Sequence, residues 1–240
     1  MKQKFHNIVV FDCETGGLDK KNNLHAIHHP ITQIALLGID GLTLSEITRY
    51  SSYIKGRIAN KKYIGYSTVH DQEYQAGALQ HTGITIEKLE AEGKDYKVVC
   101  NEICDFFEQC MSGSNFHKII LAGHNVGYDI PFLQYLFKLC KKDLSKYVQG
   151  YMSHTGEFVP ADFDTQYLSR IKSTDENMKH NLTEVSGREG IELVDAHEAM
   201  ADVCATAEVL KKYIMTLRNS ASSFEKQEVS TFRKDFQFEY

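Results

Sequence analysis

Two carboxylates, Asp12 and Glu14, follow the apolar residues 8–11 and are separated by a single residue. If this run is a strand, both side chains leave the same face, because side chains alternate along a strand. Carboxylates on one face repel each other unless a cation lies between them, and hard divalent metals take oxygen ligands. A solvent-facing pair at a sheet edge is the plainer alternative. The apolar run before the pair and the Thr-Gly-Gly turn after it favour a metal site.

A third carboxylate, Asp129, lies in residues 122–133, where a short apolar strand leads into a helix. It stands two residues before Pro131, and proline is common in the first turn of a helix. An aspartate at such a place often caps the helix with its side chain. Capping would explain Asp129 without any chemistry, so this segment alone leaves a cap and a metal ligand as alternatives.

His197 and Asp202 lie where the last long helix begins. Asp195 and Glu198 have the spacing of a capping box, with Asp in place of the usual Ser or Thr, which predicts that His197 is in the first turn. Asp202 then falls about 100° from the centre of the apolar stripe, at the border of the buried face. A carboxylate on that border can face a cleft beside a sheet.

The apolar pattern also predicts the elements that must position these residues. Residues 7–12, 31–39 and 44–54 are predicted strands, and the last two form a hairpin through Asp40 and Gly41. The remaining elements are a helix over residues 99–110, a strand over 118–122, and helices over 131–139 and 203–217. This order predicts a mixed α/β sheet with helices on its faces.

The composition fits one globular domain. The chain has 240 residues, of which 42% are hydrophobic and 25% charged, so it can bury a core and is not largely disordered. The formal net charge of −5 counts against wrapping a long duplex, because that mode of binding needs a basic surplus. It does not count against holding a short nucleic-acid end through metal ions.

The cysteines and the apolar runs indicate the compartment. Six cysteines without a Cys-x-x-Cys pair are expected to be buried thiols in a reducing environment. No stretch approaches the ~18 apolar residues of a membrane span, and the first residues lack the apolar run of a secretion signal. We therefore expect a cytoplasmic protein.

The helical periodicity stops after Arg218. Residues 219–223 look like a polar linker, and the rest of the chain carries aromatic residues among charges. We therefore divide the chain into a domain over residues 1–218 and a C-terminal tail over 219–240. The tail either docks on a partner, such as a polymerase or another replication protein, or it packs back on its own domain or frays.

Taken together, the three chemical segments resemble the DnaQ-like (DEDDh) 3′–5′ exonuclease family, which includes the epsilon proofreading subunit of DNA polymerase III. The residues that match its three motifs in order are Asp12 and Glu14, Asp129, and His197 with Asp202. Weaker echoes are residues 78–85 and the pair Asp164-Thr165, and the resemblance covers residues 7–217. A sister group has Tyr where this chain has Glu198, which assigns the His subtype.

The resemblance implies a ribonuclease H-like fold and hydrolysis from a 3′ end with two divalent ions, Mg²⁺ or Mn²⁺, which agrees with the convergence of several carboxylates. Asp12 would bridge both ions, Glu14 and Asp202 would complete the site of the attacking water, and Asp129 would bind the second ion. His197 would be the general base, because an imidazole titrates near the operating pH. The residues implied in binding the 3′ end are Thr15, Gly16, Gly17 and Leu18, with Asn125 at the penultimate nucleotide.

Three further features stand near these motifs. His81 could approach the same cleft, although a single histidine beside a glycine is more often structural. The cluster His25, His28 and His29 lacks a fourth ligand in pattern and is expected to be a solvated loop. Gln33 stands where the family usually has Glu, in the second strand.

The sequence is therefore interpreted as a metal-dependent 3′–5′ exonuclease that hydrolyses nucleotides from single-stranded DNA, of a proofreading or end-trimming type. An exoribonuclease similar to ribonuclease T and oligoribonuclease is the alternative within the class. An inactive nuclease-fold subunit that only binds nucleic acid is the alternative from another class, and the presence of all five catalytic residue types disfavours it. A nucleotide-binding regulator is disfavoured because the sequence has no Gly-x-x-x-x-Gly-Lys run.

Overall fold

A six-stranded mixed sheet forms the centre of the computed structural model, which describes residues 5–18, 25–55, 72, 74–111, 117–194 and 197–235, with residues 221–235 described by their backbone alone. The strands in spatial order are β4 (Lys94–Asp95), β3 (Glu46–Lys55), β2 (Ile31–Ile39), β1 (Ile8–Thr15), β5 (Ile120–Gly123) and β8 (Asp162–Asp164). β1 pairs antiparallel with β2 and parallel with β5, so the sheet changes direction at its central strand.

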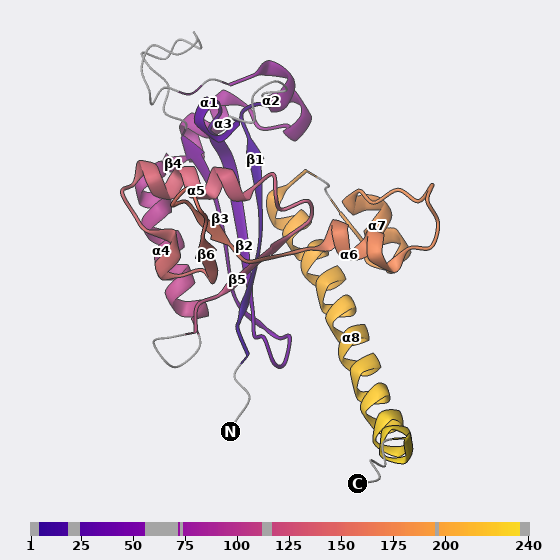
Figure 1. Ribbon diagram of the computed structural model, residues 1–240. Coiled ribbons are helices and arrows are strands. Elements are labelled where there is room, and N and C mark those ends of the chain that lie inside the picture. The colour runs from indigo at the N-terminus through magenta and orange to yellow at the C-terminus, as the bar shows by residue number, and fades with distance from the viewer. Residues whose placement is uncertain are drawn as a thin grey trace.

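The helices are distributed over both faces of the sheet and at one of its ends (Figure 1). The two helices on one face are α4 (Tyr96–Cys110) and α5 (Ile130–Leu139), and the helix on the other face is α8 (Ala199–Asp235). The short helices near the end of β1 are α1 (His25–His28), α2 (Ala76–Thr82) and α3 (Ile86–Glu92). The other elements are η2 (Leu144–Lys146), the hairpin of β6 (Gly150–Met152) and β7 (Phe158–Pro160), α6 (Thr165–Lys172) and α7 (Leu182–Arg188).

Two hydrophobic cores hold the layers together, because side chains alternate between the two faces of each central strand. Val9 and Phe11 pack in the core beneath α4 and α5. Ile8 and Val10, whose side chains point to the opposite face of the strand, pack in the core beneath α8. β2 is buried on both faces over its whole length, which explains its almost continuous apolar sequence.

The predicted strands and helices are confirmed, with shifts at their ends. The second strand has the predicted bounds, and a short connection from Asp40 to Ser45 closes the predicted hairpin. The sequence prediction missed the short elements α1 to α3 and the β6–β7 hairpin. α2 and α3 bury only Leu89 between them, so they leave almost no apolar period in the sequence.

The predicted linker at residues 219–223 is wrong, because α8 continues through it to Asp235. No glycine or proline interrupts residues 219–235, and the hydroxyls of Thr216 and Ser220 bond back to carbonyls four residues earlier instead of competing with the helix. The division of the chain at residue 218 and a docking role for the tail stay predictions.

The cysteines are free thiols, four of them buried and Cys140 and Cys204 half-buried. In the described part of the chain, the helices are too short or too polar to cross a bilayer.

Candidate active site

The end of β1 carries the first two carboxylates, Asp12 and Glu14, both half-buried on the same side of the strand. Burial, then repulsion from Asp202 and Glu198, raises the pKa of Asp12 to about 7. Burial, with repulsion from Asp12, Asp202 and Glu198, raises the pKa of Glu14 to about 8. Both groups therefore lie in a cleft where negative charge is concentrated and poorly solvated.

Asp129 turns toward β1 and does not cap α5. It occupies the residue before the helix, but its side chain makes no capping hydrogen bond. Its carboxylate instead accepts a hydrogen bond from the backbone N–H of Cys13, with an N–O distance of 3.3 Å. Burial and the charge of Asp12 hold the pKa of Asp129 well above its usual range. The capping alternative for Asp129 is therefore wrong, and its carboxylate belongs to the group on β1.

His197 lies just outside α8, which begins at Ala199. The prediction that His197 is in the first turn is wrong because Glu198 caps the helix: its side chain accepts a hydrogen bond of 2.8 Å from the N–H of Ala201. His197 has a φ of 73°, a left-handed conformation that is uncommon for a residue with a side chain. Asp195, the other half of the predicted capping box, lies outside the described residues.

Asp202, in the first turn of α8, connects this histidine to the carboxylates. It accepts a hydrogen bond of 3.2 Å from the N–H of His197, and burial raises its pKa. Ligand atoms of Glu14, His197 and Asp202 lie within 4.8 Å of one another, which is a spacing that can hold a metal ion. In this way β1, the start of α5 and the start of α8 bring all five predicted catalytic residues to one cleft.

A divalent cation fits this group of residues. Asp202 Oδ1 is buried and, among the described residues, has no hydrogen-bond partner. A buried carboxylate oxygen without a donor is costly unless a ligand satisfies it. Three neighbouring carboxylates with raised pKa values supply the hard oxygen ligands that Mg²⁺ and Mn²⁺ prefer.

Hydrogen bonds fix the loop after β1, which follows Thr15, the last residue of the strand, and consists of Gly16, Gly17 and Leu18. The N–H of Gly16 donates to the carbonyl of Pro30, and the N–H of Leu18 donates to the side chain of Gln75. These two amides are therefore already paired within the protein, and the predicted contact of this loop with the 3′ end stays a prediction. The Leu18 side chain is 43% exposed and is available as an apolar contact.

Tyr128 joins this loop to the segment of Asp129. Its hydroxyl lies 3.2 Å from the hydroxyl of Thr15 and donates to the carbonyl of Gly17 at 3.4 Å. Asn125, the other predicted substrate contact, has an exposed side chain and a φ of 61°, and its N–H donates to Asp164 at 2.9 Å. Asn125 therefore presents its amide to solvent from a fixed backbone position.

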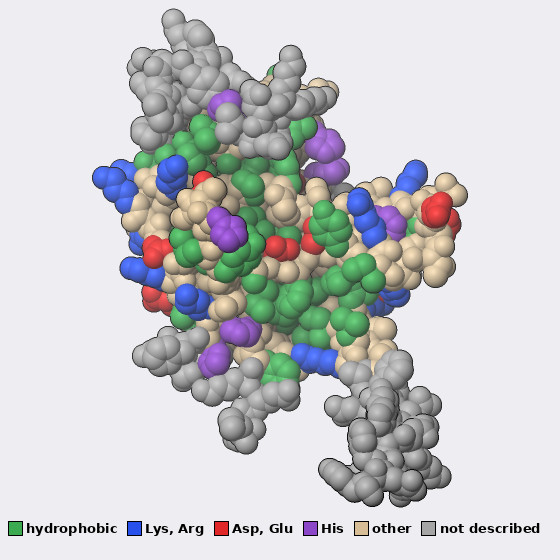
Figure 2. Space-filling model, viewed as in Figure 1, with side chains coloured by type: hydrophobic (Ala, Val, Ile, Leu, Met, Phe, Trp, Pro, Cys, Tyr) green, Lys and Arg blue, Asp and Glu red, His purple; other side chains and the backbone are tan. Residues whose placement is uncertain are grey.

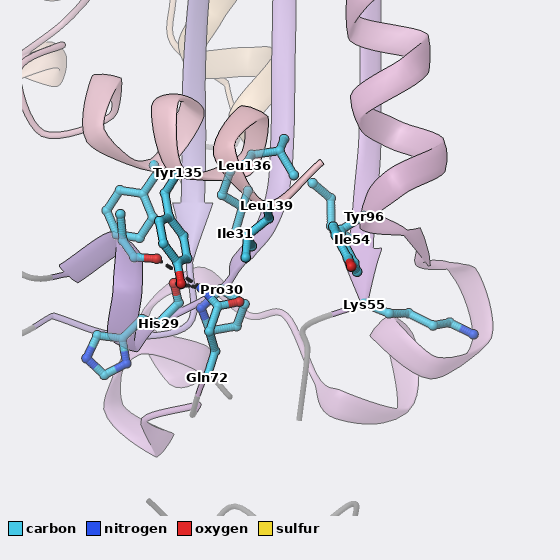
Figure 3. A pocket seen from close by; sticks show the side chains of 12 residues that line it. His29, Pro30, Ile31, Ile54, Lys55, Gln72, Tyr96, Tyr135, Leu136 and Leu139 are labelled. Carbon is cyan, nitrogen blue, oxygen red and sulfur yellow. Dashed lines mark hydrogen bonds between the residues drawn. The ribbon is translucent and has the colours of Figure 1, made fainter. Parts of the chain in front are cut away.

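The histidine cluster is not a solvated loop, because His29 is buried. Its ring packs against Gly17, where any side chain would collide with it. Beside it lies a cavity of about 20 Å³, lined by His29, Gln72 and Tyr135, which is too small for a nucleotide (Figure 3). The amide of Gln72 donates to the carbonyl of His29. His29 therefore supports the loop after β1 from beneath.

A groove of about 850 Å³ begins beside the site, at Ile130 and Pro131, and follows α5 and the β6–β7 hairpin. Two exposed lysines, Lys138 and Lys142, line it together with the half-buried ring of Tyr135. Three carboxylates line it as well, those of Asp143, Glu157 and Asp162. Figure 2 shows apolar side chains gathered in the middle of the visible face, with basic and acidic side chains on both sides. Cations beside apolar and aromatic surface are typical of a path for a single nucleic-acid strand, although in this groove the carboxylates outnumber the lysines.

The sequence interpretation missed two residues that contact the catalytic group. Glu198 places its charge near Asp12 and Glu14, and Gln33 donates a hydrogen bond to Glu198 with an N–O distance of 2.7 Å. The capping-box spacing was the one signal for Glu198, and the Glu-to-Gln departure was the one signal for Gln33. His81, from α2, places its ring centroid 4.2 Å from that of His197, so it does reach the cleft.

The family model described as "Exonuclease" matches residues 9–210 of the chain. E. coli exonuclease I in complex with a dT13 oligonucleotide has a similar fold, with a TM-score of 0.65 and 20% identity over 93% of this chain and 44% of that chain. The zinc-bound form of the complex of E. coli exonuclease I with single-stranded DNA gives a TM-score of 0.65 and 21% identity, over 92% and 43%. This chain thus spans less than half the length of those proteins. No curated protein sequence matches it. The mixed sheet with helices on both faces is the ribonuclease H-like fold that the sequence predicted.

Proposed function

Because the chain belongs to the exonuclease family, we propose that it hydrolyses nucleotides one at a time from the 3′ end of single-stranded DNA. The observation that carries this proposal is the convergence of four carboxylates and a histidine on one cleft. Asp129 in particular occupies the capping position of α5 without capping it, and its carboxylate instead bonds to the backbone of β1. A nuclease-fold subunit that only binds nucleic acid would have no use for this buried concentration of negative charge.

Two divalent ions of the Mg²⁺ or Mn²⁺ kind are proposed as cofactors, held by Asp12, Glu14, Asp129 and Asp202. When bound, such ions stabilise the charge on the attacking and leaving oxygens of a phosphoryl displacement. Exonucleases of this family act with divalent metals, and the unpaired oxygen of Asp202 supports the same assignment here.

His197 is proposed as the general base. Its ring is exposed at the edge of the cleft, and the hydrogen bond from its N–H to Asp202 fixes its backbone beside the carboxylates. An imidazole nitrogen of His197 can take the proton of the attacking water and pass it to solvent. The exposed Leu18 side chain would pack against the terminal base, and Asn125 would contact the next nucleotide.

The groove over α5 is proposed to hold the strand upstream of the reacting end. Single strands are bound through cations along the backbone and aromatic rings beside the bases, and Lys138, Lys142 and Tyr135 supply both in this groove, beside its three carboxylates. The similar E. coli exonuclease I is described with dT13 and with single-stranded DNA, which supports DNA as the substrate here. The biological role is proposed to be either proofreading or end trimming, and the duplex substrates in the experiment below distinguish the two. A polymerase is proposed as the protein partner.

The test is to incubate the purified full chain with end-labelled single-stranded DNA, matched duplex, mismatched duplex and RNA of one sequence. We expect a ladder shortened from the 3′ end of single-stranded DNA, abolished by EDTA and restored by Mg²⁺ or Mn²⁺, with Ca²⁺ supporting binding but little turnover. Preference for a mismatched over a matched 3′ end would favour proofreading. Faster cleavage of RNA would replace DNA by RNA as substrate, and full activity in EDTA would overturn the two-ion proposal.

A further inference from the structure

Gln33 lies in the middle of the sheet and contacts the beginning of α8 with both ends of its amide. It is 3% exposed, and the β1–β2 register places it directly opposite Glu14. Its Nε2 donates to Glu198 Oε1 at 2.7 Å, and its Oε1 accepts a long hydrogen bond of 3.5 Å from the N–H of Ala199. The other oxygen of Glu198 accepts from the N–H of Ala201 at 2.8 Å. Two hydrogen bonds thus join one central strand to the start of α8, and a third holds the Glu198 side chain on the first turn of that helix.

These contacts fix the part of the chain that carries His197 and Asp202. Glu198 lies between the two, and its carbonyl accepts the N–H of Asp202 at 3.1 Å. We propose that Gln33 and Glu198 form a positioning pair, which sets where His197 and Asp202 stand relative to the carboxylates of β1. This inference rests on the exonuclease function proposed above, because it concerns the efficiency of that reaction.

The pair requires one amide and one carboxylate. An amide at position 33 supplies both the donor that Glu198 needs and the acceptor for Ala199. A carboxylate at position 33 would lose the donor and would place three carboxylates, at positions 14, 33 and 198, side by side. Because buried like charges repel strongly, Gln33→Glu should push the start of α8 away from the sheet.

The same donors and acceptors are satisfied when the two residue types are exchanged. In the double variant Gln33→Glu/Glu198→Gln, the amide at position 198 would donate to the carboxylate at 33 and accept from Ala201. The carboxylate at 33 would still accept from Ala199. The net charge of the pair is unchanged, so a positioning role predicts rescue.

The experiment compares wild type, Gln33→Glu, Glu198→Gln and the double variant in single-turnover cleavage of single-stranded DNA, with KM measured separately. We expect kcat of Gln33→Glu to fall on the order of tenfold or more with little change in KM, because small displacements of reacting groups are costly. We expect the double variant to recover to within about threefold of wild type. Gln109→Glu, an exposed change on α4, is the matched control and should leave kcat unchanged.

Thermal melting and Mn²⁺ affinity of the same proteins, measured by calorimetry, give readouts that do not depend on turnover. Mn²⁺ should bind more weakly to Gln33→Glu and recover in the double variant. If Gln33→Glu does not fold, Gln33→Met removes the hydrogen bonds without adding charge and should show the same loss of kcat.

Two results would overturn the positioning pair. One is a folded Gln33→Glu or Gln33→Met protein with wild-type kcat and Mn²⁺ affinity. The other is a double variant as slow as the slower single variant. Absence of cleavage by wild type would instead overturn the proposed function, and the Mn²⁺ affinities would still decide whether the pair positions α8.

Discussion

Two halves of the candidate active site are built in different ways. The sheet half consists of Asp12, Glu14 and Asp129. The first two extend the face of the central strand that carries Ile8 and Val10, and Asp129 directly precedes α5. The helix half consists of His197, Glu198 and Asp202, which depend on where α8 begins. There the chain reaches the sheet through the hydrogen bonds of Gln33, and His197 is exposed.

The difference shows which positions tolerate change. In the sheet half the core holds the backbone, so a carboxylate can be replaced by an amide with little effect on the fold. In the helix half Ala199 and Val203 pack in the core beneath α8, whereas polar contacts hold His197 and Glu198 just before them. A change of hydrogen-bonding pattern there can therefore move candidate catalytic groups without unfolding the protein. The following variants test this contrast.

The largest effect is expected from Asp129→Asn in the sheet half. An asparagine oxygen can still accept from Cys13, but it lacks the charge that a metal needs, so the free energy of unfolding should change by less than ~1 kcal/mol. Cleavage should fall on the order of 10³-fold, because metal ligation contributes several kcal/mol to the barrier. Single-turnover rates and thermal melts measure both, with the exposed Asp105→Asn as control. Near-normal cleavage by a folded Asp129→Asn protein would remove this residue from the site.

In the helix half, His197→Ala should slow cleavage by ~10²–10⁴-fold, which is the usual loss for a general base. His197→Gln should be slow as well, since an amide cannot accept the proton. Binding of Mn²⁺ and of a DNA 3′ end should survive in both variants, because the carboxylates remain. The exposed His154 in the β6–β7 turn supplies the control substitution, His154→Ala. A rate within about threefold of wild type in folded His197→Ala would show that this residue takes no part in the reaction.

The sequence predicted the sheet half better than the helix half, for physical reasons. The apolar run before Asp12 and the proline after Asp129 are local signals that fix a strand and a helix start. The contact between Gln33 and Glu198 joins residues 165 positions apart, and no local pattern encodes it. The position of His197 was also predicted wrongly. The capping-box spacing suggested that α8 begins after Asp195, whereas the carboxylate that caps the helix is that of Glu198.

The groove beside the sheet half should affect binding more than chemistry. Lys138→Gln and Lys142→Gln should each raise KM for single-stranded DNA roughly threefold to tenfold and leave kcat nearly unchanged, because both lysines lie away from the reacting end. The slope of log KM against log salt concentration should fall by about 0.7 for each lysine that contacts a phosphate. Lys97→Gln, on the exposed side of α4, removes the same charge elsewhere and is the control. An unchanged KM in both groove variants would mean that the strand leaves the site by another route.

The smallest effect concerns the stability of the metal-free protein. The pKa values of Asp12 and Glu14 are raised to about 7 and about 8 in the folded state, whereas carboxyl groups of an unfolded chain titrate near 4. A raised pKa means that the folded protein holds these protons more tightly than the unfolded chain does. The contribution of the two groups to stability is therefore fully present below about pH 4 and is lost as the pH rises through 7 to 8.

In EDTA, the melting temperature should accordingly fall by several degrees between pH 6 and pH 8.5 because of these groups. Asp12→Asn should flatten this slope, since it removes one titrating group and relieves the repulsion on Glu14, whereas Asp105→Asn should not. Mn²⁺ competes with protons for the same carboxylates, so it should raise the melting temperature more at pH 8.5 than at pH 6. A pH slope that is equal in wild type and Asp12→Asn would mean that the cleft does not hold these protons, and the sheet half would then lack the concentrated charge on which metal binding depends.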